Sequence, residues 1–495
     1  MTHPDPVNPH GQPEASAPPS ANPEVEEPAP PLPKEPDGRP AGTDSALLGL
    51  ARHGYLFARA PYSIRDAVYG SIPLSAAAYA TLNTPLYQRL KHIKQIGPVY
   101  LVYPGATHTR FSHGIGVYHL ARLALQHLTA LVDFPPEVGR ATLAAALLHD
   151  LGHFPFSHLM DELEVGGQRL SHADLSVHLV LTDAELGRVL AGQWEVDRRM
   201  VAALIGGQPY PGVPRFLNTL LDGPMDLDKL DYLNRDAHHA GVPYGRVEVQ
   251  RLIDFLAVDP DTEDLVVTES GIGTVESVIF AKYLMFRYVY WHHTARIASA
   301  MINRAVLDAL LAAGLTDLDV THPELLRLCL ATDATMPAAL REVVAQAGAE
   351  PPPSFHLLQR VEDRQLYKRA VALSCADAPE KDQEYTDALA RRAKEQELAA
   401  ALAQRIGGPV PESTVLIDVP RRGKFAADVR GIVVPEAEGR VRVVGWEDAP
   451  LRTYFTRETV TAMENRIRTV LYIGDPQHWA WPALRQILQE HPDLL

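Results

Sequence analysis

The chain of 495 residues has only two cysteines, Cys329 and Cys375, and they form no CxxC pair. This scarcity argues against a disulfide framework and is typical of proteins from a reducing cytoplasm. No signal peptide is visible, and no apolar run reaches the roughly 18 residues that a membrane span requires. A phosphate-cradling glycine motif and an internal repeat are lacking as well. The sequence therefore predicts a cytoplasmic protein without a membrane partner.

Basic residues are too few for a surface that coats nucleic acid. The formal net charge is −15, and Met1–Ser45 holds eight acidic against two basic residues, so the remainder is only mildly acidic. Nucleic acid is therefore not indicated as a partner, although a local basic pocket for a phosphate ligand is compatible with this charge. The segment 1–45 also contains thirteen prolines. Because it can bury little apolar surface, we expect a disordered, acidic tail, with partner docking as the alternative.

The periodicity of apolar residues predicts a mainly α-helical fold. Apolar side chains recur at three- and four-residue spacing through most of residues 46–350, which we expect to form one helical domain with a long helix over 274–313. Prolines 351–353 mark a joint. Residues 351–495 are then expected to form a helical linker and a smaller mixed α/β region. Its strands are predicted at 415–419, 431–434, 441–444 and 469–473.

Titratable residues crowd the segment His149–Asp161, directly after the apolar run 141–148. Burying such groups is costly unless each is paired or holds a ligand. A helix over 138–150 would deliver His149 and Asp150 at its C-terminal end. Gly152 and Pro155 then break the helix, which leaves the following histidines on a loop.

Two further residues complete a donor set for a divalent metal. His113 follows Ser112, a predicted N-cap, and Asp228 lies on a predicted helix over 226–239. Divalent ions bind neutral imidazoles and carboxylates that converge from rigid elements. A lone histidine or aspartate is more often structural, but the joint set predicts a metal site. The predicted ligands are His113, His149, Asp150 and Asp228.

The remaining histidines of the cluster are candidates for acid–base chemistry. His158 lies three residues before Asp161, close enough for the carboxylate to orient the ring and hold its proton. His153 and His172 are further donors for phosphate oxygens. For any one of these histidines the alternative is a capping or core hydrogen bond. The predicted catalytic residues are His153, His158, Asp161 and His172.

The order H…HD…D, with spacings of 36 and 78 residues, resembles the pattern of the HD phosphohydrolase superfamily. The stretches 66–74, 88–96, 103–113, 149–161 and 226–239 are similar to the branch of deoxynucleoside-triphosphate triphosphohydrolases, without a sterile-alpha-motif portion. Two departures stand out. Ala173 follows His172 where relatives often carry a glutamate, and Phe286 occupies a position that is polar in some relatives.

The resemblance implies a helical HD-domain bundle and a reaction. A metal-activated water would attack the α-phosphate of a dNTP and release deoxynucleoside and triphosphate, with His158 protonating the departing 5′ oxygen. Arg110, Lys229 and Tyr232 would hold the phosphates, joined by Lys282 where relatives often have an arginine. Gln95, Asp236 and Tyr290 would meet the sugar, and Tyr290 would disfavour a ribose hydroxyl.

The resemblance also implies cofactors and partners. We expect a Mn, Fe, Zn or Ni-type ion at the metal site, Mg²⁺ with the triphosphate, a nucleotide activator, and assembly into a dimer or tetramer. Two alternatives stay open. The protein could hydrolyse another nucleotide, such as a monophosphate, a cyclic nucleotide or an alarmone. It could instead be a nucleotide-sensing or single-strand nucleic-acid-binding regulator that retains the site.

Overall fold

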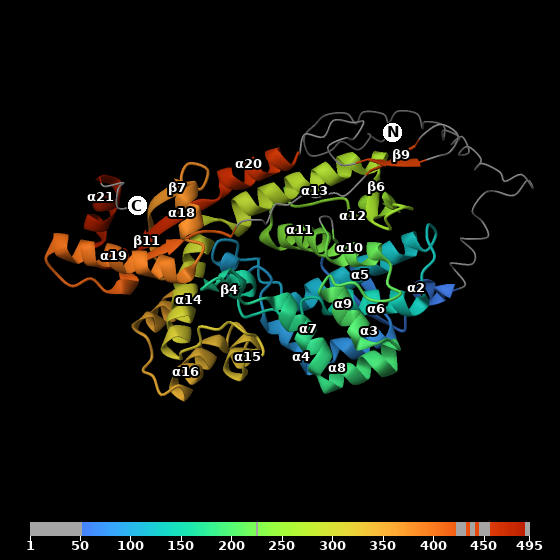
Figure 1. Cartoon of the computed structure of the whole chain (residues 1–495), viewed down its shortest axis with the longest axis horizontal. Coiled ribbons are helices and arrows are strands. Elements are labelled where there is room, and N and C mark those ends of the chain that lie inside the picture. Colours follow the sequence, from blue (N-terminus) through green and yellow to red (C-terminus); the bar gives the residue numbers. More distant parts are fainter. Residues whose placement is uncertain (1–51, 224–225, 422–431, 436–440, 445–455, 491–495) are drawn as a thin grey trace, which may run out of the picture. The chain divides into compact units, whose positions relative to one another are not determined.

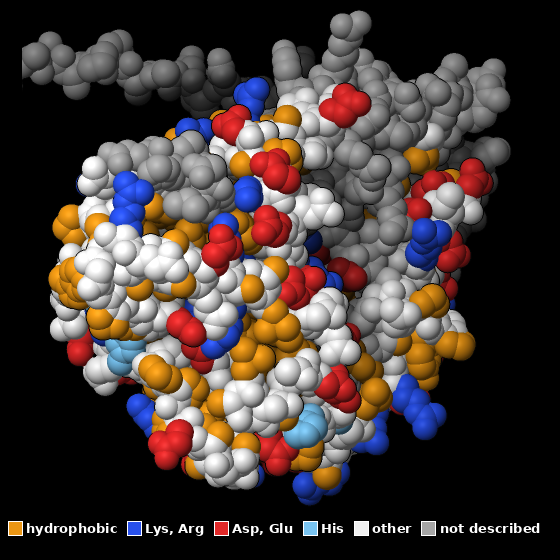
Figure 2. Space-filling view, turned by 60° about the vertical axis from the view of Figure 1, so that its left-hand side comes forward, with side chains coloured by type: hydrophobic (Ala, Val, Ile, Leu, Met, Phe, Trp, Pro, Cys, Tyr) orange, Lys and Arg blue, Asp and Glu red, His pale blue; other side chains and the backbone are white. Residues whose placement is uncertain are grey.

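The computed structural model describes residues 52–223, 226–421, 432–435, 441–444 and 456–490. The predicted tail, 1–45, lies outside this part of the chain. Residues Leu48–Leu495 belong to one compact unit, in which helices predominate and the sheets are small (Figure 1). The predicted mainly α-helical fold is thus confirmed. Within the described residues, no helix combines the length and apolar character needed to cross a membrane. Acidic and basic side chains are interspersed on the face drawn in Figure 2.

Three helices position the candidate metal ligands: α5 (Arg110–Leu128), α6 (Pro136–Leu148) and α11 (Leu227–Ala240). Helix α5 packs against both of the others, and its glycines permit the close approach. A Cβ atom on Gly116 would lie 1.9 Å from Asp231 Oδ1 of α11, and one on Gly114 would lie 3.1 Å from the carbonyl oxygen of Leu147 of α6. Any larger side chain at either position would push the helices apart.

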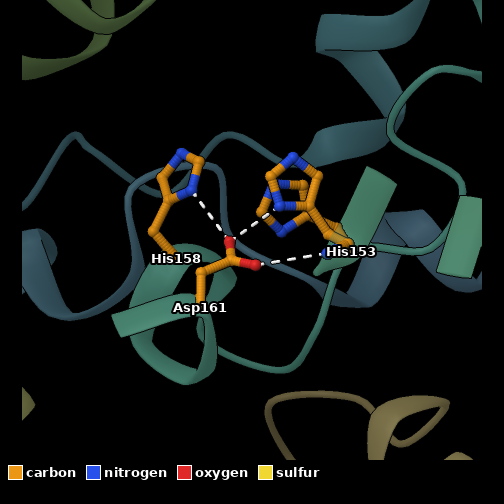
Figure 3. A group of neighbouring side chains, drawn as sticks. His153, His158 and Asp161 are labelled. Carbon is orange, nitrogen blue, oxygen red and sulfur yellow. Dashed lines mark hydrogen bonds and ion pairs between the residues drawn. The ribbon is translucent and has the colours of Figure 1, made fainter. Parts of the chain in front are cut away.

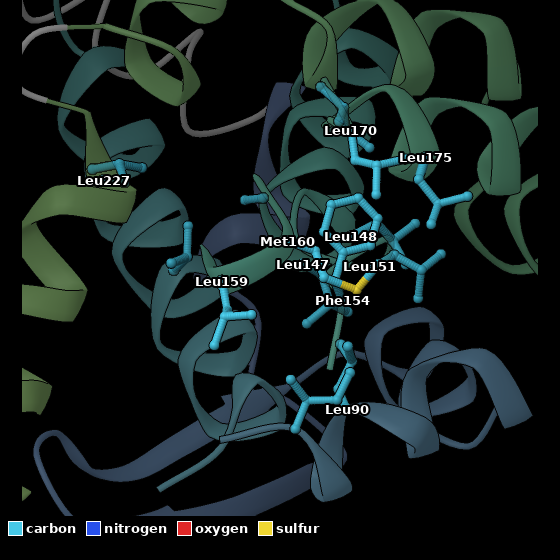
Figure 4. Close-up of a cluster of buried hydrophobic side chains, with 14 of the residues drawn as sticks. Leu90, Leu147, Leu148, Leu151, Phe154, Leu159, Met160, Leu170, Leu175 and Leu227 are labelled. Carbon is cyan, nitrogen blue, oxygen red and sulfur yellow. The ribbon is translucent and has the colours of Figure 1, made fainter. Parts of the chain in front are cut away.

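The segment after α6 is fixed by a layer of buried leucines (Figure 4). Leu147 and Leu148 end α6, Leu151 and Phe154 follow in the loop, and all four side chains are fully buried. These apolar residues interleave with the titratable ones, so packing determines which side chains face the site. The segment then enters the 3₁₀ helix η3 (Ser157–Glu162), a regular turn where a loop was expected.

The entry to η3 has an unusual backbone. Phe156 and Ser157 have φ angles of +56° and +58°, in the left-handed region that non-glycine residues rarely adopt. Such a conformation costs about 1–3 kcal/mol per residue and persists only where surrounding contacts hold it. Here the amide of Phe156 donates to Asp333 Oδ1 at 2.7 Å, and Ser157 Oγ donates to the carbonyl of Lys94 at 2.5 Å.

Two predicted helices have different boundaries in the structure. The helix of His113 begins at Arg110 with Thr109 as N-cap, so Ser112 is not the cap; its hydroxyl instead donates to the carbonyl of Thr109. The expected helix over 274–313 is two helices, α13 (Ile272–Met285) and α14 (His293–Ala312). A π-helical turn over Phe286–Tyr290 separates them, and the side chain of His292 caps α14 by accepting from the Thr294 amide.

Two sheets contain the C-terminal strands. One is antiparallel in the order β7-β11-β8, and the other has the order β10-β9-β6-β5, in which β9 runs parallel to β6. The second sheet therefore joins strands on both sides of residue 350, and the division into domains there stays a prediction. The strands are β5 (Leu256–Val258), β6 (Leu265–Thr268), β7 (Lys368–Ser374), β8 (Val415–Asp418), β9 (Ile432–Pro435), β10 (Val441–Val444) and β11 (Thr469–Gly474).

Candidate functional site

Three predicted metal ligands converge at one point. His113 comes from the first turn of α5, His149 from the C-terminal end of α6, and Asp228 from the first turn of α11. Asp228 Oδ1 lies 2.9 Å from His113 Nε2 and 3.8 Å from His149 Nε2. One donor atom from each of the three residues lies within 4.8 Å of the other two.

The bonding of both imidazoles fits a divalent ion at this point. His113 Nδ1 donates to Asp231 at 2.7 Å, and His149 Nδ1 donates to the carbonyl of Ala146 at 2.9 Å. In the neutral form that binds a metal, each ring keeps the lone pair of its Nε2, because a neutral imidazole carries a proton on one nitrogen only. Both Nε2 atoms are buried beside Asp228, and neither makes a well-aligned hydrogen bond among the described residues. Two nitrogens and a carboxylate oxygen form a donor set suited to a divalent transition metal.

Asp150, the fourth predicted ligand, lies beside this group. Its Oδ1 is 3.5 Å from His149 Nε2, and its Oδ2 is 3.4 Å from His113 Nε2. Arg110 donates to Oδ2 at 2.5 Å. Burial would raise the pKa of Asp150, but Arg110 and the two histidines hold it well below its usual value, so the carboxylate is ionised. Its role as a ligand stays a prediction.

A buried network of charged residues contacts His113 at Nδ1, on the side of the ring away from the metal donors. Sequence reasoning did not identify this network. Asp231 accepts from His113 and from Arg235 Nε at 2.8 Å, while Arg235 Nη1 donates to Asp66 at 2.7 Å. Burial would raise the pKa of Asp231, but Arg235 and His113 lower it to about 2. The carboxylate is thus charged and fixes the tautomer and direction of the ring, as outer carboxylates do around protein metals. Arg235 belongs to this network and does not line the cavity described below.

The predicted catalytic residues form a second cluster next to the first. Asp161 Oδ2 accepts from His158 Nδ1 at 3.2 Å and from His172 Nδ1 at 2.8 Å. Figure 3 shows His158 on one side of Asp161 and His153 on the other. The ring of His153 stacks on that of His172 with 4.1 Å between centroids. The predicted contact between His158 and Asp161 is therefore confirmed, and Asp161 also orients His172 although Ala173 follows it.

The environments of two stacked rings push their pKa values apart. Burial, with Arg110 and His172 nearby, lowers the pKa of His153 well below the usual value. Burial acts in the same direction on His172, but Asp161 outweighs it and raises the pKa. His153 is then neutral near pH 7, and both of its ring nitrogens are buried without a hydrogen-bond partner among the described residues. The ring is fully buried, and its predicted contact with a phosphate oxygen stays a prediction. Pairs of titratable groups separated in this way are typical of acid–base sites.

A cavity of about 370 Å³ opens beside both clusters. Asp150 and Asp228 line it near the first cluster, and His158 and His172 line it near the second. Its volume is within the range of small-molecule sites. All of the predicted substrate-binding residues also line it: Gln95, Arg110, Lys229, Tyr232, Asp236, Lys282 and Tyr290.

Several of these side chains are already paired in the structure. Arg110 donates to Asp150, to Ser157 Oγ at 3.0 Å and to the carbonyl of Gln95 at 3.1 Å. The ammonium of Lys229 is bound by Asp226 and by the carbonyl of Gly223. Both cations thus line the cavity with other contacts in place, and their phosphate roles stay predictions.

The predicted sugar residues Gln95, Asp236 and Tyr290 all line the cavity, and two of them are hydrogen-bonded to each other. Tyr290 donates to Asp236 Oδ2 at 2.6 Å, and His108, which sequence reasoning did not single out, lies 2.7 Å from Asp236 Oδ1. The ring of Tyr232 meets that of Tyr290 edge-on at 6.3 Å. Gln95 is buried, and its Oε1 has no hydrogen-bond partner among the described residues. An unsatisfied buried acceptor at a cavity wall is well placed to accept from a ligand hydroxyl.

A helical chain that gathers imidazoles and carboxylates beside such a cavity has the features of a metal-dependent hydrolase. Comparison with protein families identifies an HD domain over residues 110–233 and an HD associated region over residues 247–441. The chain thus contains an HD domain followed by an HD associated region. The domain match contains all four predicted metal ligands and all four predicted catalytic residues.

Proteins similar to this chain include some with a named activity and some without. The chain is 34% identical over 224 residues to the uncharacterized protein YwfO of Bacillus subtilis, covering 45% of this chain and 50% of YwfO. It is 32% identical over 282 residues to the human deoxynucleoside triphosphate triphosphohydrolase SAMHD1, covering 50% of this chain and 44% of SAMHD1. The chain thus spans about half the length of these curated relatives.

Among solved structures, the chain resembles a phosphohydrolase from Bacteroides thetaiotaomicron. The two are 25% identical with a TM-score of 0.61, and the match covers 84% of this chain and 99% of that one. A hypothetical protein from Aquifex aeolicus, 24% identical, also has a TM-score of 0.61, with 86% of this chain and 99% of that chain covered. The helical fold is therefore shared along most of the chain.

The network behind His113 predicts how metal affinity depends on Asp231. Asp231→Asn removes the charge that fixes the His113 ring, so we expect Mn²⁺ to bind about 10–100-fold more weakly by titration calorimetry. Asp259→Asn, which removes a buried carboxylate bound to Asp261 and Thr262 instead, is the matched control. Equal Mn²⁺ affinity in wild type and a folded Asp231→Asn variant would contradict this role.

Proposed function

We propose that the protein is a metal-dependent phosphohydrolase that converts dNTPs to deoxynucleoside and triphosphate. The observation that carries this proposal is the single cavity reached by both clusters. Asp228 lines it on the side of the metal donors, and His158 and His172 line it on the side of the acid–base group. A phosphoryl group between them would meet charge stabilisation on one side and proton donors on the other.

The roles follow from the bonding of each side chain. A divalent ion bound by His113, His149, Asp228 and Asp150 would stabilise charge on a phosphoryl oxygen and lower the pKa of attacking water. His158, oriented by Asp161, is placed to protonate the 5′ oxygen as it leaves the α-phosphate. His153 donates to a non-bridging oxygen through its unpartnered ring, and His172 does so as a cation held by Asp161.

The substrate class is supported by the cavity wall and by the relatives. Gln95, Asp236 and Tyr290 supply an acceptor, a carboxylate and an aromatic ring where a sugar would lie, and a phosphatase for substrates without a sugar would not need this set. The human relative is named a deoxynucleoside triphosphate triphosphohydrolase. A nucleotide activator and a dimeric or tetrameric assembly, as well as Mg²⁺ on the triphosphate, belong to the same proposal.

Product analysis tests this function directly. Purified protein is incubated with each dNTP, alone and in mixtures, with Mn²⁺ or Mg²⁺, and the products are separated by ion exchange. We expect deoxynucleoside and inorganic triphosphate in equal amounts, with turnover lost in Asp228→Ala and His149→Ala because each removes a metal donor. Asp254→Ala, at an exposed position at the end of helix α12 (Val249–Asp254), controls for the substitution itself. Release of monophosphate or pyrophosphate, or no conversion of any dNTP, would refute the assignment.

The charge of Asp161 predicts a shift in the pH profile. Asp161 raises the pKa of His172 against the effect of burial, so the protonated form persists to higher pH than for an ordinary histidine. In Asp161→Asn this contribution is lost, the pKa falls, and the protonated form disappears at lower pH. We therefore expect kcat to fall and the basic limb of the kcat–pH profile to move to lower pH.

Asp174→Asn provides the matched control for the pH experiment. Asp174 is exposed, lies two residues after His172 on α7 (His172–Thr182), and is bound through its amide to Ser171 Oγ. We expect its profile to match that of wild type. An unchanged basic limb in Asp161→Asn would show that His172 does not act as a cation in turnover.

A further inference from the structure

Arg296 connects the 3₁₀ helix η3, which carries His158 and Asp161, to the C-terminal sheet β7-β11-β8 through two carboxylates. It lies in the first turn of α14 and donates from Nη1 to both oxygens of Glu162, at 3.0 and 2.7 Å. Its Nε and Nη2 donate to the two oxygens of Asp418, at 2.9 and 2.7 Å. One guanidinium therefore holds two carboxylates that lie more than 250 residues apart in the sequence.

This connection is rigid because of where its members lie. The side chains of Arg296 and Asp418 are 7% and 4% exposed, and that of Glu162 is 13% exposed. Paired hydrogen bonds between a guanidinium and a carboxylate fix direction as well as distance, and burial shields them from water. Asp418 ends strand β8 and is held in register opposite Leu471 of β11. The sheet thus provides a fixed anchor.

The other end of the connection is the turn that carries the acid–base group. Glu162 is the last residue of η3 and directly follows Asp161, which bonds to both His158 and His172. The first end of η3 is the left-handed segment that Asp333 holds through the amide of Phe156. A strained turn needs restraint at both ends, and Glu162 is the restraint at the second.

We propose that Arg296 and Asp418 are positioning residues for catalysis: the C-terminal sheet holds Arg296, and Arg296 holds Glu162 and with it the Asp161–His158 pair. Arg296 also lines the cavity, whereas Asp418 lies outside the lining formed by the described residues. Asp418 therefore acts only through Arg296. The catalytic part of this inference rests on the proposed hydrolase function, and its structural part does not.

Asp418→Asn tests the connection with little change in shape. It keeps one acceptor oxygen but removes the charge, so Arg296 is held less firmly and the position of Asp161 is less defined. Small misplacement of a catalytic group costs one to two orders of magnitude in rate. We expect kcat to fall about tenfold with KM nearly unchanged, because no substrate contact is lost. In hydrogen–deuterium exchange of the metal-loaded protein, amides of residues 157–163 should exchange faster.

Asp475→Asn is the matched control. Asp475 makes the same kind of two-bond pair with Arg360, its side chain is 14% exposed, and neither residue lines the catalytic cavity. We expect this variant to keep the wild-type kcat and the wild-type exchange of residues 157–163, even if it unfolds at a lower temperature. A general loss of stability would affect both variants alike.

A double-mutant cycle separates a linked effect from two independent ones. Glu162→Gln and Asp418→Asn act through the same guanidinium, so the double variant should lose much less kcat than the product of the single losses. Unchanged exchange and unchanged kcat in Asp418→Asn would overturn the inference. If wild type hydrolyses no dNTP, the proposed function fails, and the exchange of residues 157–163 alone still decides whether Asp418 holds the turn.

Discussion

The structure depends on the cost of burying imidazoles and carboxylates where helix α5 packs against α6 and α11. His113 and Asp231 are fully buried, and Asp150 is nearly so. Unpaired, each would cost several kcal/mol of desolvation. The chain offsets this cost with Arg235 behind the metal donors and Arg110 beside them. The Nε2 atoms of His113 and His149, which face Asp228, are among the buried polar atoms without a hydrogen-bond partner in the described residues, and an ion at that point would bind both.

The same constraint separates the roles of the histidines. The stacked rings of His153 and His172 have opposite pKa shifts. Burial, with Arg110 nearby, lowers the pKa of His153, whereas Asp161 outweighs the effect of burial on His172 and raises its pKa. The buried leucines of α6 and of the loop after it fix the start of the segment that carries these histidines. Asp333 holds Phe156 at one end of η3, and Arg296 holds Glu162 at the other. The segment Phe156–Glu162 is therefore strained and is restrained by three parts of the chain.

Much of the site could be predicted because its signals are local. The apolar run before His149 predicts a helix that ends at the site, and the spacing of His158 and Asp161 predicts their contact. Local patterns are less informative about boundaries: Ser112 resembles a cap, yet Thr109 starts the helix, and the continuous pattern over 274–313 hides the π-helical turn that places Tyr290 on the cavity. Asp231 and the Arg296–Asp418 pair were missed because their partners lie 118 and 122 residues away. No periodicity records such a pairing.

Crystals soaked in Mn²⁺ would test the metal site most directly, since two clusters among the described residues have donor atoms close enough to hold a metal. Anomalous diffraction locates the ion without reference to any activity. We predict one strong peak within about 2.0–2.3 Å of His113 Nε2, His149 Nε2 and an oxygen of Asp228. A peak held instead by His153, His158, Asp161 and His172, with none between His113 and Asp228, would contradict it.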